Sequence, residues 1–135
     1  MTKNTVLNSY QKWQIGNDIR ELLLADTSVT EAVGQNIFPV IAPIETVGDF
    51  ILYKREKYSK KMTTMGVYED DCQISISVIA DNYDNATSIA SMIDNALTGQ
   101  HYIKDNTVRL RIDLMDSTED FEDNKYIEVL LFRIR

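Results

Sequence analysis

The apolar residues near the start of the chain recur at helical spacing. They lie three or four positions apart, at Ile15, Ile19, Leu22 and Leu23. This spacing places them on one face of a helix that we expect over 15–24. Gly16 interrupts the pattern that leads into this stretch, so residues 1–14 either extend the helix or form a separate N-terminal arm.

A second, shorter helix is expected over 28–33. Ser28 and Glu31 have the spacing of a capping box, in which the hydroxyl and the carboxylate each accept a hydrogen bond from a backbone N–H that the helix leaves unpaired. Gly34 follows and is able to end the helix.

Both prolines of the chain, Pro39 and Pro43, stand in the apolar run "IFPVIAP" over 37–43. Proline removes a backbone donor and pushes the preceding residue toward extended geometry, so this run belongs in neither a helix nor a central strand. We expect an extended, buried connector whose apolar side chains pack under a sheet.

The middle of the chain changes from helical spacing to alternation. Residues 50–56 begin apolar and become charged, which predicts a strand that leaves the core for solvent. Residues 57–66 follow as the exposed tip of a hairpin, so the hairpin forms an arm. Over 68–80 the apolar positions Ile74, Ile76 and Val78 alternate with polar ones, as in a strand with one core-facing side.

The last third of the chain predicts a helix and two strands. Apolar residues at helical spacing and a following glycine indicate a helix over 84–98. Alternation predicts a strand at 108–114 and another at 126–135, joined by an acidic loop over 116–124.

This order of elements predicts a single domain over 1–135 of the α+β class. We expect a four-stranded, mainly antiparallel sheet with two main helices packed on one face and an extended β-hairpin arm. The last strand is apolar on both faces, with Ile127, Val129 and Leu131 opposite Leu130, Phe132 and Ile134. Helices on one side would leave one apolar face uncovered, and a second copy of the chain is the simplest cover.

Charge is plentiful and unevenly placed. The formal net charge is −7, which disfavours a protein that must neutralise many phosphates, so we expect no sequence-specific nucleic acid binding. One cluster is basic, formed by Lys54, Arg55, Lys57, Lys60 and Lys61, and another is acidic, formed by Asp116, Glu119, Asp120, Glu122 and Asp123. Each alone reads as a solvated loop. Together they are candidates for complementary patches at a subunit interface.

The sequence offers little catalytic chemistry. His101 is the only histidine, and Cys72 is the only cysteine, so neither forms a recognisable metal site, disulfide or acid–base pair. The glycines are scattered and form no phosphate-binding loop. We therefore expect no enzyme and no cofactor. The N-terminus lacks the apolar core of a secretory signal and no segment is apolar enough to span a membrane, so we expect synthesis in the cytoplasm and no membrane contact.

The segment "IRELLLADTSVTEAVGQNIFPVIAPIE", residues 19–45, carries a family resemblance. It resembles the tail-completion, or tail-terminator, proteins of long-tailed bacteriophages and prophages. In that family a helix ending in Leu-Leu-x-x-Asp precedes a short capped helix, a Val-Gly, an Ile-(Phe/Tyr)-Pro and an Ala-Pro. The matching residues are Leu23, Leu24, Asp26, Val33, Gly34, Ile37, Phe38, Pro39, Ala42 and Pro43.

The resemblance implies a structural role in the virion. Such proteins are similar to subunits of a ring, commonly sixfold, that caps the finished tail tube, joins it to the head connector and lets DNA pass. The basic arm and the acidic tip are outside the matched pattern, and we assign them to the contact between subunits. Two alternatives stay open: another neck protein on the head side, such as an adaptor or stopper, and a small cytoplasmic enzyme or ligand-binding domain.

Overall fold

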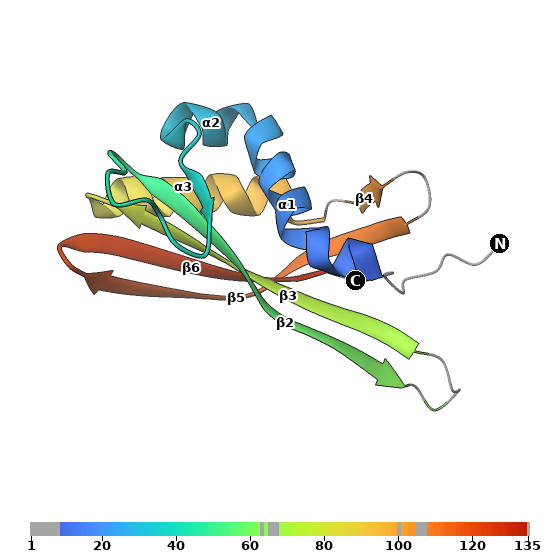
Figure 1. The fold of residues 1–135 in the computed structure, drawn as a ribbon. Coiled ribbons are helices and arrows are strands. Elements are labelled where there is room, and N and C mark those ends of the chain that lie inside the picture. Colours follow the sequence, from blue (N-terminus) through green and yellow to red (C-terminus); the bar gives the residue numbers. More distant parts are fainter. Residues whose placement is uncertain (1–8, 63, 65–67, 100, 105–107, 135) are drawn as a thin grey trace.

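Three helices pack on one face of a mixed sheet (Figure 1). The computed structural model describes residues 9–62, 64, 68–99, 101–104 and 108–134. Five strands form a continuous sheet in the order β1-β2-β3-β6-β5, and the short strand β4 pairs with the far edge of β5. The α+β class is confirmed.

The first helix, α1 (Ser9–Ala25), runs through Gly16 without a break. A Cβ at that position would lie 3.3 Å from the ring of Tyr53, so glycine lets the helix approach the sheet closely. Residues 9–14 of the stretch that we had left open are therefore helical, and residues 1–8 lie outside the described part of the chain.

The second helix, α2 (Thr27–Val33), is capped by Asp26. The carboxylate of Asp26 accepts a hydrogen bond from the N–H of Val29 at 3.1 Å. Ser28 lies inside the helix, so the predicted capping box is wrong. Gly34 ends the helix as expected, with a positive φ of 62° and its N–H donated to the carbonyl of Thr30.

Strand β1 (Ile37–Pro39) pairs in parallel with the start of β2 (Phe50–Met62). Ile37 is buried, but the linker that follows is not, and the expected burial of the whole run is wrong. The aliphatic residues of this linker are mostly exposed: Val40, Ile41, Ile44 and Val47. The reason is topological, because β1 is the edge strand of the sheet and the described part of the chain places no further strand beyond it.

Strands β2 and β3 (Tyr68–Ala80) form the long hairpin arm. The strand that we expected to end at residue 56 continues to Met62, so most of the predicted tip is paired backbone. The pairing shifts between Arg55 and Lys57, which leaves Glu56 as a β-bulge.

The C-terminal half contains α3 (Tyr83–Leu97), β4 (His101–Lys104), β5 (Val108–Glu122) and β6 (Lys125–Ile134). The acidic loop predicted over 116–124 is wrong, because 116–122 continue β5 and pair with β6. Only Asp123 and Asn124 form the turn. The exposed half of this hairpin needs no apolar alternation, since backbone hydrogen bonds to β6 hold it.

The predicted count of four strands is also corrected. Strands β1 and β4 are only three and four residues long and carry no alternation that a sequence reading detects. The four long strands are antiparallel as expected, and the β1–β2 pair makes the sheet mixed.

The core lies between the helices and the sheet. Helix α3 contributes Ala86, Ile89, Ile93 and Leu97, and alternate residues of β3 and β6 face them. The buried apolar members of β3 and β6 are Cys72, Ile74, Ile76, Val78, Ala80, Leu130, Phe132 and Ile134. The predicted alternation of both strands is confirmed. None of the helices in the described part of the chain is long and apolar enough to span a membrane.

Candidate subunit-interface surfaces

The side of the sheet away from the helices (Figure 1) is here called the open face. Residues paired across neighbouring strands share a face, and the register places Ile79 opposite Ile127 and Ser77 opposite Val129. The open face carries a row of apolar residues: Phe50, Leu52, Ile79, Ile127, Val129 and Leu131. All six are half-buried.

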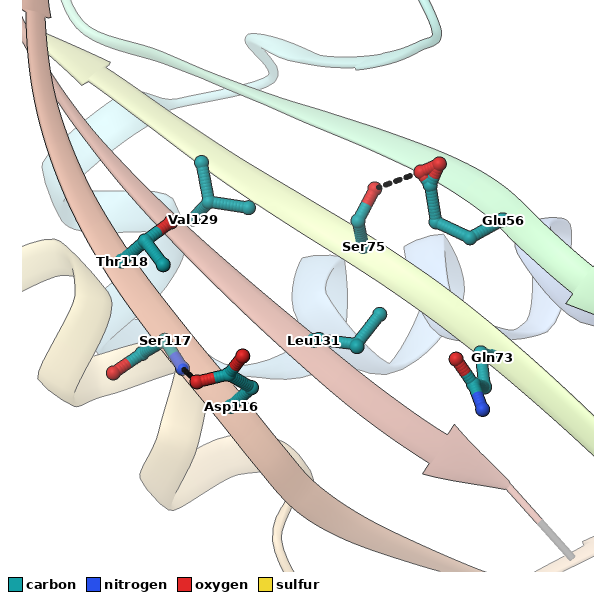
Figure 2. Close-up of a pocket in the computed structure, with 8 residues that line it drawn as sticks. All are labelled: Glu56, Gln73, Ser75, Asp116, Ser117, Thr118, Val129 and Leu131. Carbon is teal, nitrogen blue, oxygen red and sulfur yellow. Dashed lines mark hydrogen bonds between the residues drawn. The ribbon is translucent and has the colours of Figure 1, made fainter.

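A cavity of about 270 Å³ opens on this face. Figure 2 shows Val129 and Leu131 of β6 between the polar side chains of β3 and β5. Ser75 donates a hydrogen bond to Glu56 at 3.4 Å, and the N–H of Ser117 donates to Asp116 at 2.9 Å. The cavity is smaller than the roughly 300–1,000 Å³ that is typical of small-molecule sites. A shallow apolar hollow of this kind suits a protein side chain.

An ion pair crosses the open face at the base of the arm. The guanidinium of Arg133 in β6 donates a hydrogen bond to the carboxylate of Asp71 in β3 at 2.8 Å. The Asp71 side chain is only 4% exposed and that of Arg133 is 23% exposed. In a pair so shielded from water, removing one partner would leave the other charge buried and uncompensated.

The predicted basic residues all lie on β2, in the arm. Lys54 and Lys57 are exposed, and Lys54 forms an ion pair of 3.3 Å with Glu56. Lys60 and Lys61 stand opposite Asp70 and Glu69 in the register of the hairpin. Their side chains lie outside the described ones.

Arg55 differs from the other basic residues because it is on the helix side of the sheet. Its guanidinium carbon lies 4.2 Å from the centre of the Trp13 ring in α1, which is a cation–π contact. Trp13 is itself 65% exposed, so this pair forms part of the surface. Arg55 is therefore engaged within its own chain.

The predicted acidic residues lie on β5 and its turn. Asp116 and Asp120 share the open face with Leu131 and Ile127, respectively, and both are exposed. Glu119 faces the helix side, opposite Glu128 of β6. Asp123 and Glu122 are at the tip, next to Lys125.

The tips of the two charged hairpins lie at opposite ends of the sheet, whereas Lys54 and Asp116 stand at the same level on its two edges. Strand β3 runs from one of these ends to the other. Tyr68 lies at the far end of the arm, and Ala80, which pairs with Tyr126, lies next to the β5–β6 turn. Thirteen strand residues separate these ends by about 40 Å. Figure 1 shows the two hairpins pointing in opposite directions. The charges at the two tips therefore cannot meet within one chain.

A titratable cluster that the sequence did not reveal lies at the start of α3. The hydroxyl of Tyr83 donates a hydrogen bond to Glu119 at 2.7 Å, and Glu119 is also hydrogen-bonded to Glu128. Burial, with the neighbouring Glu119 carboxylate, raises the pKa of Glu128 to about 7. The hydrogen bond from Tyr83 lowers the pKa of Glu119. The two carboxylates thus hold one proton near neutral pH.

Few groups in the described part of the chain suggest metal or acid–base chemistry. No group of three or more histidine, cysteine, aspartate or glutamate side chains is placed there to hold a metal ion. Cys72 is fully buried in the core, as a structural cysteine would be. His101 is on β4, and its side chain lies outside the described ones.

The chain is similar to a known protein family. The family model for tail completion protein gp17 matches residues 17–135, which is most of the chain. No curated protein matches it.

Solved structures share the fold. One chain, from the virion of a native gene transfer agent particle, aligns with a TM-score of 0.75 at 20% identity, over 87% of this chain and 90% of that one. A second, named only by a sequence identifier, aligns with a TM-score of 0.61 at 9% identity, over 94% and 96%. Identities this low establish a common fold and nothing finer.

Proposed function

Because this chain belongs to the tail completion protein gp17 family, we propose that it forms a ring that caps a tail tube and joins it to the head connector. Family membership makes the chain a structural tail protein of a phage-like virion, as the resemblance implied. The ring, its position and its contacts are the proposal.

The observation that carries the ring is the separation of charge. The tip of the basic arm and the tip of the acidic β5–β6 hairpin lie at opposite ends of one sheet, about 40 Å apart. The two charged sets also lie on opposite edges of that sheet, with β3 and β6 between them, so they are placed to contact another copy and not each other. Two different, complementary surfaces on one subunit produce a head-to-tail contact. Such a contact repeats from copy to copy and closes into a ring when the rotation allows it.

We take the ring to be sixfold, with the tail tube on one side and the head-side connector proteins on the other. The half-buried apolar open face and the exposed aliphatic linker over 40–47 give the subunit surfaces beyond the ring contact. A net charge of −7 suits a channel through which DNA slides, since a basic wall would hold the phosphates.

Assembly across salt concentrations tests the ring. Native mass spectrometry of the purified protein is expected to give a hexamer whose fraction falls as salt rises, because exposed charge pairs are screened within about 10 Å at 0.1 M salt. The double variant Lys57→Glu with Lys60→Glu is expected to be monomeric at low salt. Glu31→Lys, which changes an exposed charge on α2, is the matched control and keeps the hexamer.

A rescue experiment tests whether the basic and the acidic set contact each other. Reversal of the acidic set, Asp116→Lys with Asp120→Lys, is expected to break the ring alone and to restore it when combined with the reversed arm. Reversed arms that assemble normally at low salt would contradict a contact between these two sets.

Imaging with tail tubes tests the position in the particle. Negative-stain electron microscopy of tubes from the same particle, mixed with the protein, is expected to show added density at one tube end only. Binding to the portal complex and not to the tube would favour an adaptor or stopper on the head side.

A further inference from the structure

Two segments at the edges of the sheet have a strand on one side only, among the residues that the structure describes. Beyond the three residues that pair with β1, strand β2 pairs with β3 alone over 54–62. Beyond the four residues that pair with β4, strand β5 pairs with β6 alone over 112–122, and the carbonyl of Ile112 also accepts a hydrogen bond from the N–H of Gly99. The outer edge of each segment is a template for another strand.

The charges on these edges select the strand that can pair. Residues 54–62 carry five basic side chains and one acidic, whereas 112–122 carry five acidic and none basic. Two copies of the β2 edge repel each other, and so do two copies of the β5 edge. Charged residues and a bulge normally protect an edge, and each edge here has both. Opposite signs remove that protection for one combination, β5 with β2 of another copy.

The strand directions suit this combination. Strands β2 and β6 run one way through the sheet, and β3 and β5 run the other way. A copy placed beside the first by a sideways shift therefore brings its β2 antiparallel to β5. Antiparallel pairing is the more stable arrangement.

The lengths of the two segments also match. The part of β2 that pairs on one side only has nine residues and that of β5 has eleven, and each is bounded by a short strand, β1 or β4. Aligning the centres of the segments displaces the next copy along the strands by about four residues. Stagger of this kind is what a sheet needs in order to close on itself.

We propose that β5 of each copy pairs antiparallel with β2 of the next, so that the sheets of the ring join through backbone hydrogen bonds. This inference rests on the proposed head-to-tail ring and names its contact: the occupant of each edge is a second copy of this chain. The open faces of all copies then form one continuous surface.

Disulfide scanning between copies tests the pairing. Lys57, Ser59, Asp116 and Thr118 all lie on the open face. Cysteine pairs across antiparallel strands link only when the residues are directly opposite, since a disulfide needs Cβ atoms about 3.5–4.5 Å apart. Matching the centres of the two segments places residue 57 opposite 118 and residue 59 opposite 116. Cys72 is fully buried and stays unlinked as the background thiol.

The expected result is a ladder of disulfide-linked oligomers for Lys57→Cys with Thr118→Cys, and for Ser59→Cys with Asp116→Cys. The crossed combinations, Lys57→Cys with Asp116→Cys and Ser59→Cys with Thr118→Cys, are the matched controls and stay unlinked. If the two strands pair in another register, the scan is extended to further cysteine positions along both segments. In any antiparallel register, each step of two residues forward in β2 moves the linked position two residues backward in β5.

Backbone hydrogen exchange gives a second, substitution-free readout. Amides in 54–62 and 112–122 are expected to exchange at least tenfold more slowly in the assembled ring than in the monomer at high salt. A ring in native mass spectrometry with neither the linking pattern nor this protection overturns the strand pairing and leaves the ring. A chain that stays monomeric with tail tubes present and forms no links overturns both.

Discussion

At the scale of single residues, Val40 has a costly backbone conformation. Its φ is 62°, a region that branched side chains rarely adopt. The N–H of Val40 donates to the carbonyl of Tyr53 at 2.9 Å, and that of Ile41 donates to Pro39 at 2.6 Å, which closes a tight turn at the end of β1. Val40 is 61% exposed, so burial of its side chain does not offset the strain.

Replacing Val40 should therefore stabilise the isolated subunit. Asparagine tolerates positive φ and keeps the N–H that bonds Tyr53, so Val40→Asn is expected to raise the free energy of unfolding by about 1 kcal/mol. Urea unfolding measures this. Ile41→Asn, at an exposed neighbour without a positive φ, should change it by less than about 0.5 kcal/mol. An equal effect of both would show that the backbone of Val40 is not the cause.

Glu128 is the residue whose ionisation is most displaced toward neutral pH. Its folded pKa of about 7 lies above that of an ordinary glutamate, so the folded chain holds this proton more tightly than the unfolded chain does. The stability that this group contributes is complete below about pH 4.5 and is lost as pH rises to about 7. The lowered pKa of Glu119 has the opposite effect on stability: its contribution is present near neutral pH and is lost as the pH falls into the acidic range.

Glu128→Gln should flatten the pH profile. The amide keeps a donor toward Glu119 without ever acquiring a charge, so the variant is expected to be more stable than the native chain at pH 8 and to lose less stability between pH 5 and 8. Thermal unfolding at pH 5, 6, 7 and 8 gives the comparison. Glu45→Gln, at an exposed linker position, should reproduce the native profile. If Glu128→Gln also reproduces it, the carboxylates do not share a proton.

At the scale of elements, the β5–β6 hairpin depends on its two turn residues. Asp123 and Asn124 have φ of 53° and 61°, between the paired residues Glu122 and Lys125. A two-residue loop with both φ values positive matches the twist of the strands it joins. Aspartate and asparagine adopt this conformation at little cost, and that is why the acidic stretch is a hairpin with a tight end.

A branched residue at the turn should weaken the hairpin. Asn124→Val is expected to lower the free energy of unfolding by about 1–2 kcal/mol, because its Cβ and side chain oppose a positive φ. Asn124→Gly is the matched control and should stay within about 0.5 kcal/mol of the native chain, since glycine adopts this conformation freely. Chemical denaturation distinguishes them, and equal losses would point to a lost side-chain contact.

At the scale of the whole molecule, the sheet has two apolar faces and the helices cover only one. Two neighbouring residues of β6 lie on different faces. Leu130 is 3% exposed and lies on the helix side, whereas Leu131 lies on the open face. The monomer therefore folds around one side of its sheet, and the proposed contacts in the tail would use the other side.

Adjacent substitutions separate folding from assembly. Leu130→Asp buries an unpaired charge in the core and is expected to unfold the monomer. Leu131→Asp is expected to leave circular dichroism and the thermal midpoint close to native but to prevent incorporation into tails. Tails that accept Leu131→Asp at native levels would show that the open face makes no essential contact.

Much of the fold was predictable because its signals are local. Helix α3 was expected over 84–98 and is found over 83–97, since an apolar stripe with a polar cap at Asn82 and a stop at Gly99 is specific. The alternation of β3 is equally specific. The cap of α2 was missed because Asp26 and Ser28 are both good caps and only the entry path of the chain chooses between them.

Of the interface candidates, the sequence identified the charged sets and the two-faced last strand, while their role as a contact stays a prediction. It did not reveal that Glu119 turns to Tyr83, since a bulge between Leu114 and Asp116 moves Glu119 to the helix side. It did not reveal the contact of Arg55 with Trp13 either, because that contact depends on where α1 lies over the sheet. The exposure of the linker was not predicted, because an apolar sequence does not show whether another segment covers it in the fold.

By itself, the sequence determined which residues face the core within each long element, because periods of 2 and 3.6 are properties of local backbone geometry. It also determined the family, through residues 19–45. Only the tertiary structure decided the order of the strands, the opposite ends that the two charged hairpins occupy and the edges that stay unpaired. These features depend on backbone pairing between distant segments, which no local pattern encodes.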